Sequence, residues 1–320
     1  MIDIRADGYS GLMFMIIALF LLSSCAFTSN VVQDTVSENG TIEVYFCPQD
    51  NCSRILAENI RAAEDVACAF YDVSSPDVLA AITAGKAAVV IDDENYFGLG
   101  TKAYAQGIMH DKFCIFDRTR IFSGSYNPTA GGNSHRNNIV LIDSQFLANN
   151  YLQEFKELNA NVPQDKKERT RYQKILLSGV LIENYFCPED QCEEHVLSAI
   201  MTADESVSFM TYSFTADRIG DYLVSQNSRL DIRGIFEEQQ LGEYSEYEKM
   251  NKGRMKVKVD EQPYLQHNKV FILDNETVIT GSFNPSQNAD KNNDENILII
   301  HSPEIAQKYL AEFEKTWSRI

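Results

Sequence analysis

The sequence has 320 residues and a mass of 36.2 kDa, which is enough chain for one large hydrophobic core or two ordinary ones. Hydrophobic residues make up 44% and charged residues 23%, an ordinary globular composition outside the N-terminus. The net charge of −18 repels polyphosphate backbones at long range, so it argues against tight nonspecific binding of DNA, but it leaves room for a locally positive cleft.

An apolar stretch of eleven residues, 12–22, is the first predicted element. A bilayer needs about 20 residues, so the stretch is too short to span one and favours the core of a signal peptide. The stretch ends in Leu-Ser-Ser-Cys, which resembles a lipobox, in which Cys25 would be lipidated. We therefore expect a signal peptide and lipobox over residues 1–25, export, and attachment to the extracytoplasmic side of a membrane through the N-terminus. The mostly acidic charges before the stretch leave open an uncleaved signal anchor or a misassigned start codon.

The rest of the sequence contains two copies of one unit, because IEVYFCPQDNC from Ile42 recurs as IENYFCPEDQC from Ile182. Each copy reads in order as a strand, an amphipathic helix, a second strand, a hairpin, a further strand and a closing helix. We expect repeats over residues 42–160 and 177–320, joined by a polar linker at 161–176. Strands that alternate with helices predict an α/β fold with two pseudo-symmetric halves, each a mixed sheet flanked by helices.

The second copy is longer than the first between its cysteines and its hairpin. The cysteines are offset by 140 positions and the hairpins by 157, which leaves 157 − 140 = 17 extra residues. They fall within or near 237–264, and we expect them to influence the choice of substrate.

Each copy begins with two cysteines separated by four residues. An exported protein can keep disulfides, so we predict that each pair closes a small loop. The predicted pairs are Cys47 with Cys52 and Cys187 with Cys192. A zinc site with four cysteine ligands is the alternative, although this spacing is wider than that of most zinc knuckles. Cys68 and Cys114 lie in apolar strand-like runs and are interpreted as buried packing thiols.

The hairpins hold the most informative pattern, HDKFCIFDRTRIFSGSYNP from His110 and HNKVFILDNETVITGSFNP from His267. Side chains two positions apart on a strand point to the same face, so the histidine and the lysine of each copy project together. Two-residue turns at 118–119 and 275–276 would place the Ser and Asn of Gly-Ser-x-Asn opposite them. One histidine, one lysine, one serine and one asparagine on a single patch are what a phosphate group requires. The aspartate at the end of each strand is expected to fix the turn or the lysine.

The pattern H-x-K-x4-D-x6-G-S-x-N resembles the signature of the phospholipase D superfamily, and the chain has two full copies of it. The resemblance covers roughly residues 42–318 and implies two phospholipase D-like halves with the active site at their interface. It also implies hydrolysis of a phosphodiester through a phosphohistidine intermediate, without a metal or another cofactor, by a chain that is active as a monomer. The implied catalytic residues are His110, Lys112, Asp117, His267, Lys269 and Asp274. The implied phosphate-binding residues are Ser125, Asn127, Ser282 and Asn284.

The resemblance also points to residues that orient the histidines. In relatives a carboxylate at the start of the next strand does so; Glu295 matches that role for His267, and Asn137 stands at the corresponding place for His110. An amide stabilises imidazolium less than a carboxylate does, so we expect His110 to attack and His267 to donate the proton. The departure from a carboxylate at Asn137 leaves open some loss of activity.

Several functions are compatible with these motifs. Export, a lipid anchor and the negative charge favour hydrolysis of phospholipid head groups, in the manner of a phospholipase D. An exported endonuclease that cuts DNA or RNA is the first alternative, and it would need a basic cleft, which one run of cations could supply. That run comprises Lys249, Lys252, Arg254, Lys256 and Lys258. Transphosphatidylation and an inactive module that binds anionic lipid or nucleic acid are the others.

Overall fold

The computed structural model describes residues 35–320 with the exception of residue 86. The predicted signal peptide, the lipobox and Cys25 lie outside the described residues. Within the described part of the chain, no helix is long and apolar enough to cross a membrane.

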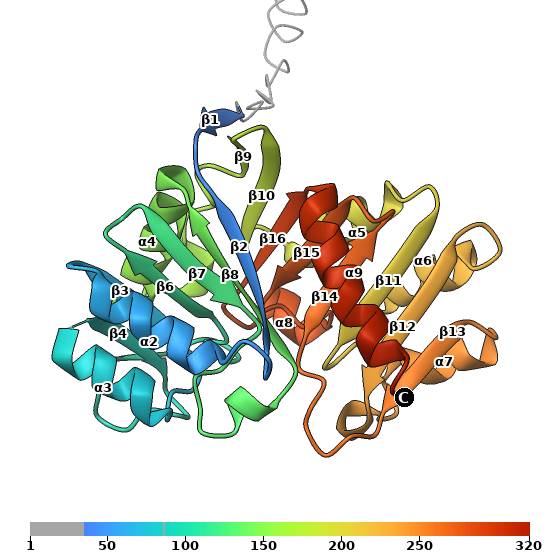
Figure 1. Cartoon of the computed structure of the whole chain (residues 1–320), viewed down its shortest axis with the longest axis horizontal. Helices are drawn as coiled ribbons and strands as arrows, with labels where there is room; N and C mark the ends of the chain where they lie inside the picture. The colour runs from blue at the N-terminus through green and yellow to red at the C-terminus, as the bar shows by residue number, and fades with distance from the viewer. Residues whose placement is uncertain (1–34, 86) are drawn as a thin grey trace, which may run out of the picture. The chain divides into compact units, whose positions relative to one another are not determined.

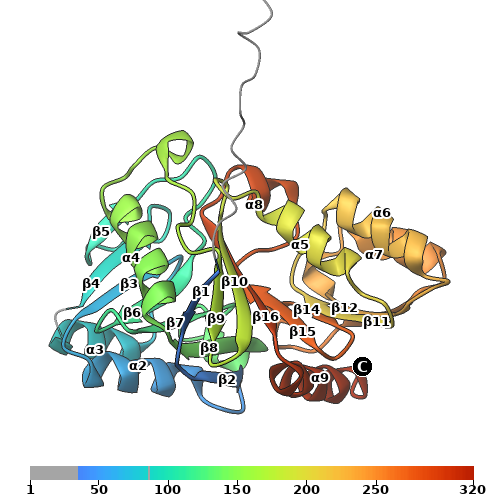
Figure 2. The same cartoon turned by 90° about the horizontal axis from the view of Figure 1, so that it is seen from above.

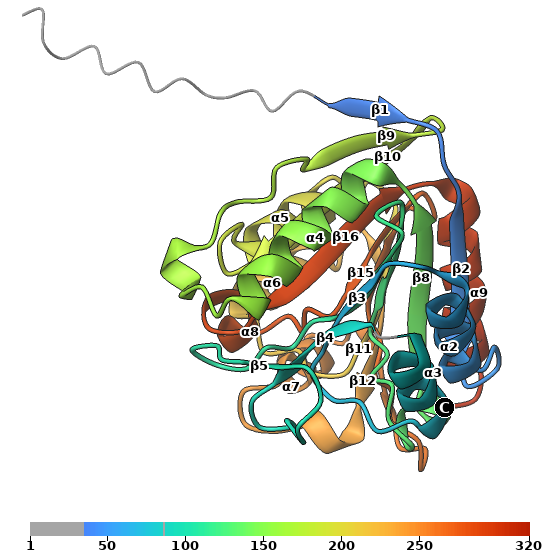
Figure 3. The same ribbon diagram turned by 90° about the vertical axis from the view of Figure 1, so that its left-hand side faces the viewer.

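The first copy of the repeat forms a seven-stranded mixed sheet in the order β2-β8-β7-β6-β3-β4-β5 (Figure 1). Its strands are β2 (Ile42–Cys47), β3 (Val66–Phe70), β4 (Ala88–Asp92), β5 (Thr101–Ala103), β6 (Lys112–Phe116), β7 (Arg120–Gly124) and β8 (Asn137–Asp143). Helices α2 (Cys52–Ala62) and α3 (Pro76–Gly85) cover one face, and α4 (Gln145–Asn159) covers the other (Figure 3). Strands β3 and β6 are buried along their whole length because both faces are covered.

The second copy forms a nine-stranded sheet in the order β1-β9-β10-β16-β15-β14-β11-β12-β13. Its strands are β1 (Val36–Glu38), β9 (Lys174–Leu177), β10 (Val180–Cys187), β11 (Ser206–Thr211), β12 (Asp231–Glu237), β13 (Lys256–Asp260), β14 (Lys269–Leu273), β15 (Thr277–Gly281) and β16 (Glu295–His301). The helices are α5 (Cys192–Met201), α6 (Asp217–Gln226), α7 (Glu246–Lys252), α8 (Gln287–Lys291) and α9 (Pro303–Trp317). Helices α5, α6 and α7 lie on one side of this sheet and α9 on the other (Figure 2).

The strand orders confirm the predicted pseudo-symmetric halves, because β8-β7-β6-β3-β4-β5 recurs as β16-β15-β14-β11-β12-β13. Strand β1, which precedes the first copy, pairs in parallel with β9 and so extends the sheet of the second half. Strand β9 begins inside segment 161–176, the predicted linker. Lys167 of the same segment is buried between Glu154 of the first half and Asp294 of the second. The extra residues of the second copy contribute α7 and the short 3-10 helix η3 (Glu238–Gln240), and β13 follows them.

Three hydrophobic cores hold the described chain together. Two outer cores lie under α2 and α3 in the first half and under α5, α6 and α7 in the second. The third core is shared, since it contains residues of both sheets together with α4 and α9. Within it, Phe113 of the first half and Phe186 of the second pack edge-on against Tyr151 of α4. Burial of this shared apolar layer fixes the two sheets against each other, and with them the ends of the hairpins.

The cysteines form three disulfides in the described chain. The predicted pairs Cys47–Cys52 and Cys187–Cys192 are confirmed, which rules out the four-cysteine zinc site. The interpretation of Cys68 and Cys114 as free thiols is wrong, because they are bonded to each other. They stand directly opposite on the antiparallel strands β3 and β6, and that register is set by the whole sheet rather than by local sequence.

The two motif hairpins have loops of three residues, 117–119 and 274–276, so the predicted two-residue turns are wrong. Phe116 pairs with Arg120, and Leu273 pairs with Thr277, one position out of the predicted register. The first two residues of each loop have positive φ, which the sequence pattern did not reveal. A shift of one residue moves every second-strand side chain to the other face. It therefore turns the serines of Gly-Ser-x-Asn away from the lysines.

Candidate active site

The two halves meet where the motif hairpins begin, and the chain segments before each histidine bond to the other half. The backbone N–H of His110 donates to the Asp294 carbonyl, and that of His267 donates to the Arg136 carbonyl, each at 2.9 Å. Two isolated β-bridges, Met109 with Asp294 and Arg136 with Gln266, have the same pseudo-symmetric relation. The two histidines are thus fixed relative to each other by backbone contacts across the interface.

Side-chain amides fill the interface beneath the histidines. Asn138 donates to Tyr309 at 2.9 Å and to Thr280, while Asn296 accepts from Ser123 at 2.8 Å. Asn138 and Asn296 occupy equivalent positions at the starts of β8 and β16 and are both fully buried. Buried polar groups that are hydrogen-bonded in this way favour one specific arrangement of the two halves, in addition to stabilising their contact.

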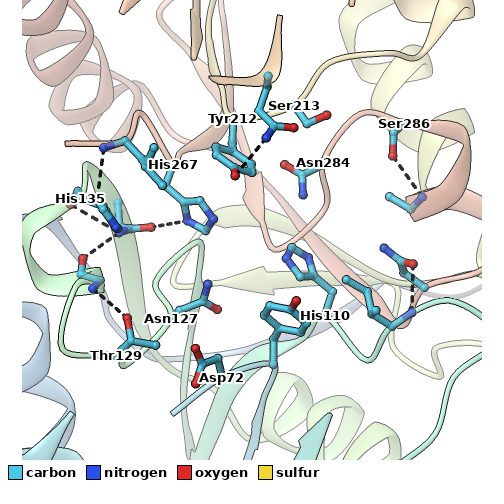
Figure 4. A pocket seen from close by; sticks show the side chains of 18 of the residues that line it. Asp72, His110, Asn127, Thr129, His135, Tyr212, Ser213, His267, Asn284 and Ser286 are labelled. Atoms are coloured by element: carbon cyan, nitrogen blue, oxygen red, sulfur yellow. Dashed lines mark hydrogen bonds between the residues drawn. The ribbon is translucent and has the colours of Figure 1, made fainter. Parts of the chain in front are cut away.

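A cavity of about 520 Å³ opens between the halves, which is large enough for a small ligand (Figure 4). Residues from both motifs line it in pseudo-symmetric pairs. These pairs are His110 with His267, Asn127 with Asn284, and Tyr71 with Tyr212. The structure therefore places both predicted histidines and both predicted asparagines in one site.

His110 is 6% exposed, and its ring is fixed on two sides. Its Nδ1 atom lies 2.8 Å from Oε2 of Glu295, which belongs to the other half. The Tyr71 ring packs edge-on against the imidazole at 5.1 Å between centroids. When Glu295 is ionised it accepts the Nδ1 proton, so Nε2 is the ring nitrogen with a free lone pair.

His267 is fixed in the same way but by a neutral acceptor. Its Nδ1 atom lies 2.8 Å from Oδ1 of Asn137, and the Ser125 carbonyl is 3.1 Å away. The Tyr212 ring lies 4.7 Å from the imidazole. Because amide and carbonyl oxygens only accept hydrogen bonds, Nδ1 must carry a proton, and Nε2 is again the atom left for substrate.

The predicted pairing of these residues is wrong. Glu295 orients His110 rather than His267, and Asn137 orients His267 rather than His110. The starts of β8 and β16 lie at the interface, so each orienting side chain reaches the histidine of the opposite half. Proximity along the sequence therefore misleads here, and the electrostatic argument built on it reverses.

The motif lysines are buried below the histidines. Lys112 donates to the backbone carbonyl of His110, and Lys269 donates to that of His267 at 2.8 Å. Each ammonium also lies over a tyrosine ring, Lys112 at 5.2 Å from Tyr71 and Lys269 at 4.9 Å from the equivalent ring. In the described chain neither lysine has a carboxylate within ion-pair distance, so both remain available to an anion.

Burial shifts the proton affinities of the whole cluster. It lowers the pKa of Lys112 to about 7 and that of Lys269 well below its usual value. Burial, reinforced by the lysine charges, also holds the pKa of His110 and of His267 well below the usual range. Burial raises the pKa of Glu295 to about 7. A phosphodiester monoanion in the cavity favours the protonated forms of the lysines and of a histidine. Its binding therefore stabilises the positive charges that burial disfavours.

The asparagines and the serines of the motifs differ in position. Asn127 and Asn284 line the cavity, and the Oδ1 atom of each is buried without a hydrogen-bond partner. The expectation that Ser125 and Ser282 bind phosphate is wrong. Both are fully buried in the interface, where Ser125 donates to Asn137 at 3.0 Å and Ser282 accepts from the Asn296 N–H at 2.9 Å.

The motif aspartates lie outside the site, so their assignment as catalytic residues is wrong. Asp117 is seven residues from His110 along an extended strand, which corresponds to roughly 23 Å. It accepts the backbone N–H groups of Glu64 and Asp65 at 2.8 and 2.9 Å. Asp274 accepts three such groups in the second half. Their role is to fasten the hairpin turn to the preceding helix–strand loop, as the first of the two expectations proposed.

Four of the five cations in the basic run that a nuclease would need already have partners within the protein. Lys249 contacts Asp217, Asp221 and Glu246, all within 3.0 Å. Lys252, Lys256 and Lys258 bond to Glu248, Asp231 and C-terminal carbonyls. None of the described residues that line the cavity is a lysine or an arginine.

Asn293 and Asp72 are among the residues of the cavity wall that were not identified from the sequence. Asn293 donates to Oε1 of Glu295 at 3.1 Å and so holds the carboxylate that holds His110. Asp72 lines the cavity on the first half, where the second half has Ser213. An alignment of the two copies carried the signal for Asp72, because Tyr-Asp in one copy corresponds to Tyr-Ser in the other.

Comparisons with known proteins agree with the geometry. The family model described as "Cardiolipin synthase, PLD-like domain" matches residues 68–159 and 196–317. "Phospholipase D" of Rickettsia conorii is 32% identical over 136 residues, which are 42% of this chain and 68% of that protein. "Mitochondrial cardiolipin hydrolase" of Homo sapiens is 28% identical over 126 residues, 39% of this chain and 50% of that protein. The crystal structure of phosphatidylserine synthase from Haemophilus influenzae covers 87% of this chain and 85% of its own at 12% identity, with a TM-score of 0.63, a likeness of fold.

Proposed function

This chain belongs to the phospholipase D superfamily and is a hydrolase of that family, and we propose that it cleaves the head group from a phospholipid through a phosphohistidine intermediate. One observation carries the proposal. The two motif histidines face one cavity, and Nδ1 of each is bound by a fixed acceptor from the other half. Each Nε2 atom is therefore left for a phosphodiester in the cavity.

The proposed reaction has two steps. First, Nε2 of His110 attacks phosphorus, a P–N bond forms, and the P–O bond to the head group breaks while His267 gives its Nε2 proton to the departing oxygen. Next, water loses a proton to Nε2 of His267 and attacks phosphorus, so that the P–N bond breaks and phosphatidic acid leaves. The proton taken from water replaces the one that His267 gave up in the first step, so the enzyme is regenerated.

The roles of the two histidines follow from their different acceptors. His110 becomes cationic as its P–N bond forms, and the Glu295 carboxylate stabilises that charge. His267 must release a proton, and the Asn137 amide stabilises its imidazolium less than a carboxylate would. The structure thus supports the nucleophile and acid expected from the sequence, but for a reason opposite to the one that the sequence suggested.

Four side chains are positioned to stabilise the phosphoryl oxygens. The buried ammonium groups of Lys112 and Lys269 supply positive charge from below. Asn127 and Asn284 supply amides at the cavity wall. Donors that are fixed before the substrate arrives need little reorganisation as charge develops on the oxygens, and this is the main way in which such sites lower a barrier.

Phospholipid is favoured over nucleic acid because a single phosphodiester is all that the cavity can neutralise. A nucleic-acid strand would bring further phosphates to a wall that has no described cation, on a protein with a net charge of −18. Three disulfides in the described chain are typical of an exported protein. They support the proposal that the protein is exported; the further proposal that its N-terminus anchors it outside the cytoplasm rests on the lipobox-like sequence at Cys25. Both motifs are in one chain, which supports activity as a monomer.

The substrate is tested with the full-length protein in excess EDTA, given vesicles of mixed phospholipids and single-stranded DNA together. We expect phosphatidic acid and no DNA fragments. DNA fragments alone would make the protein a nuclease, and neither product from a folded protein would make it a binding module. Phosphatidyl alcohol in place of phosphatidic acid, when an alcohol is added, would show transphosphatidylation.

The intermediate is tested by acid quenching during turnover of a phospholipid with a radiolabelled phosphorus. We expect label on His110 and none in H110A, and we expect H267A to lose turnover, because both the formation and the hydrolysis of the phosphoenzyme need His267. His195 lies outside the cavity and stacks on Tyr185, so H195A is the control that should label like wild type. Label mapped to His267 would reverse the proposed roles.

A further inference from the structure

Asp72 is the one carboxylate among the described residues that line the cavity; the rest of the wall consists of neutral groups and three histidines, His110, His135 and His267. It borders the cavity beside Asn127 (Figure 4). The carboxylate accepts the backbone N–H of Val73 and feels the charge of Lys112, but among the described residues it has no ion-pair partner. The Asp72 carboxylate therefore forms no salt bridge with a described residue and orients no other side chain.

The other half shows that the fold does not require a carboxylate here. The backbone around Asp72 has the same bonds as the backbone around Ser213. Tyr71 N–H donates to the Asp111 carbonyl at 3.0 Å, and the equivalent Tyr212 N–H donates to the Asn268 carbonyl at 2.9 Å. Downstream, Ser74 and Ser75 both bond to the Pro128 carbonyl, as their counterparts bond to the Pro285 carbonyl. The two positions are thus equivalent, and serine serves at one of them.

A carboxylate in a phosphate site needs an explanation, because it repels the anion that the site is built to bind. It also sits near Lys112 and so weakens the pull of that ammonium on a phosphoryl oxygen. Both effects oppose binding of a plain phosphodiester. They are offset only when the ligand brings a positive charge of its own to Asp72.

We propose that Asp72 is a specificity-determining residue that binds the alkylammonium group of the substrate, so that the preferred substrates are zwitterionic phosphodiesters of the phosphocholine or phosphoethanolamine class. The inference rests on the proposed function, whose substrate class it narrows. The cavity of about 520 Å³ has room for a phosphate and a short ammonium arm together. The tyrosine rings already have buried lysines over them, so the carboxylate is the cation partner that remains free.

The test compares two soluble short-chain lipids, dihexanoyl phosphatidylcholine and its neutral isostere with a 3,3-dimethylbutyl head group. They share shape and reacting bond and differ only in the charge of the head group. We expect full-length wild type to prefer the choline lipid by about twofold to fivefold in kcat/KM, the range of a partly exposed ion pair. In D72N and in D72S the ratio should fall to about one.

Glu94→Gln is the matched control, because it removes the same charge from a residue that is exposed and lies outside the cavity wall. It should keep the wild-type ratio. A wild type without preference, or a D72N protein that keeps the preference, overturns the inference.

A binding measurement separates this inference from the proposed function. Calorimetric titration with phosphocholine and with 3,3-dimethylbutyl phosphate needs no turnover. Selective binding of phosphocholine that is lost in D72N supports the inference even where no lipid is hydrolysed. Absence of lipid hydrolysis would refute the proposed function and leave the role of Asp72 in place. Equal binding of the two ligands by wild type refutes the role of Asp72 while leaving hydrolysis intact.

Discussion

Replacing Glu295 by glutamine should lower activity and raise stability at the same time. The carboxylate lies 2.8 Å from Nδ1 of His110 and is fully buried. Glutamine keeps the size of the side chain but removes its charge, so the charge-assisted part of the hydrogen bond is lost. A hydrogen bond to a charged group contributes roughly 1.5–3 kcal/mol, which corresponds to a loss of about 10-fold to 100-fold in kcat/KM.

The free energy of unfolding should move the other way. Burial raises the pKa of Glu295 from 4.5 to about 7, so the folded state binds the carboxyl proton more tightly than the unfolded state does. The wild type therefore loses stability as the pH rises through this window, and the loss is complete above it. A shift of this size corresponds to at most about 3 kcal/mol. E295Q does not carry this loss, so it should be more stable than wild type at about pH 8 and similar to it below about pH 4.5.

Both effects are measured on one set of samples, by initial rates of phospholipid hydrolysis and by urea unfolding at several pH values. Glu246→Gln is the control, because Glu246 is also buried and its pKa is also raised to about 7, yet it lies outside the cavity. It should share the direction of the stability effect and leave the rate unchanged. E295Q with a rate within threefold of wild type, or with lower stability than wild type at about pH 8, would refute the reasoning.

Three other outcomes follow from the structure. The pH profile of kcat/KM should have an acidic limb near neutrality, because Glu295 must lose a proton and burial raises its pKa to about 7 in the free site; E295Q should lack this limb. D274A should lower the free energy of unfolding by about 1–3 kcal/mol, since three backbone N–H groups, one of them partly buried, lose a charged acceptor, while kcat/KM stays within about twofold in a steady-state assay. Replacing both Cys68 and Cys114 by alanine should cost about 4 kcal/mol in urea unfolding, the chain-entropy value for a loop closed over 46 positions.

The repeated pattern around His110 and His267 was enough to predict much of the fold and the centre of the site. A strand–helix alternation that occurs twice implies two sheets, and two half-sites imply an interface between them. The two asparagines of the motifs also line the cavity as predicted, although the strand register from which they were placed was wrong. These features depend on local sequence alone, and local sequence is what a repeat makes visible.

The remaining features depend on contacts between distant residues. The hairpin loop has three residues, which places Ser125 in the interface, and the residues of the turn did not indicate that loop length. Cys68 and Cys114 became partners only because β3 and β6 are neighbours in the sheet. The pairing of Glu295 with His110 spans 185 positions and both halves. In each case the deciding term is the register of packed sheets, which short segments of sequence do not encode.

The departure from a carboxylate at Asn137 is better explained as a division of labour than as a loss of activity. The Nδ2 atom of Asn137 donates to the carbonyls of Gly132 and His135, so the amide cannot turn round, and only Oδ1 is offered to His267. A carboxylate there would face two carbonyl oxygens and would have no proton to give them. The surroundings of Asn137 therefore require an amide, whereas Glu295 receives a proton donor from a neighbouring side chain. The nearly symmetric frame holds an asymmetric pair of acceptors, and a reaction in which one histidine gains positive charge while the other gives up a proton needs that asymmetry.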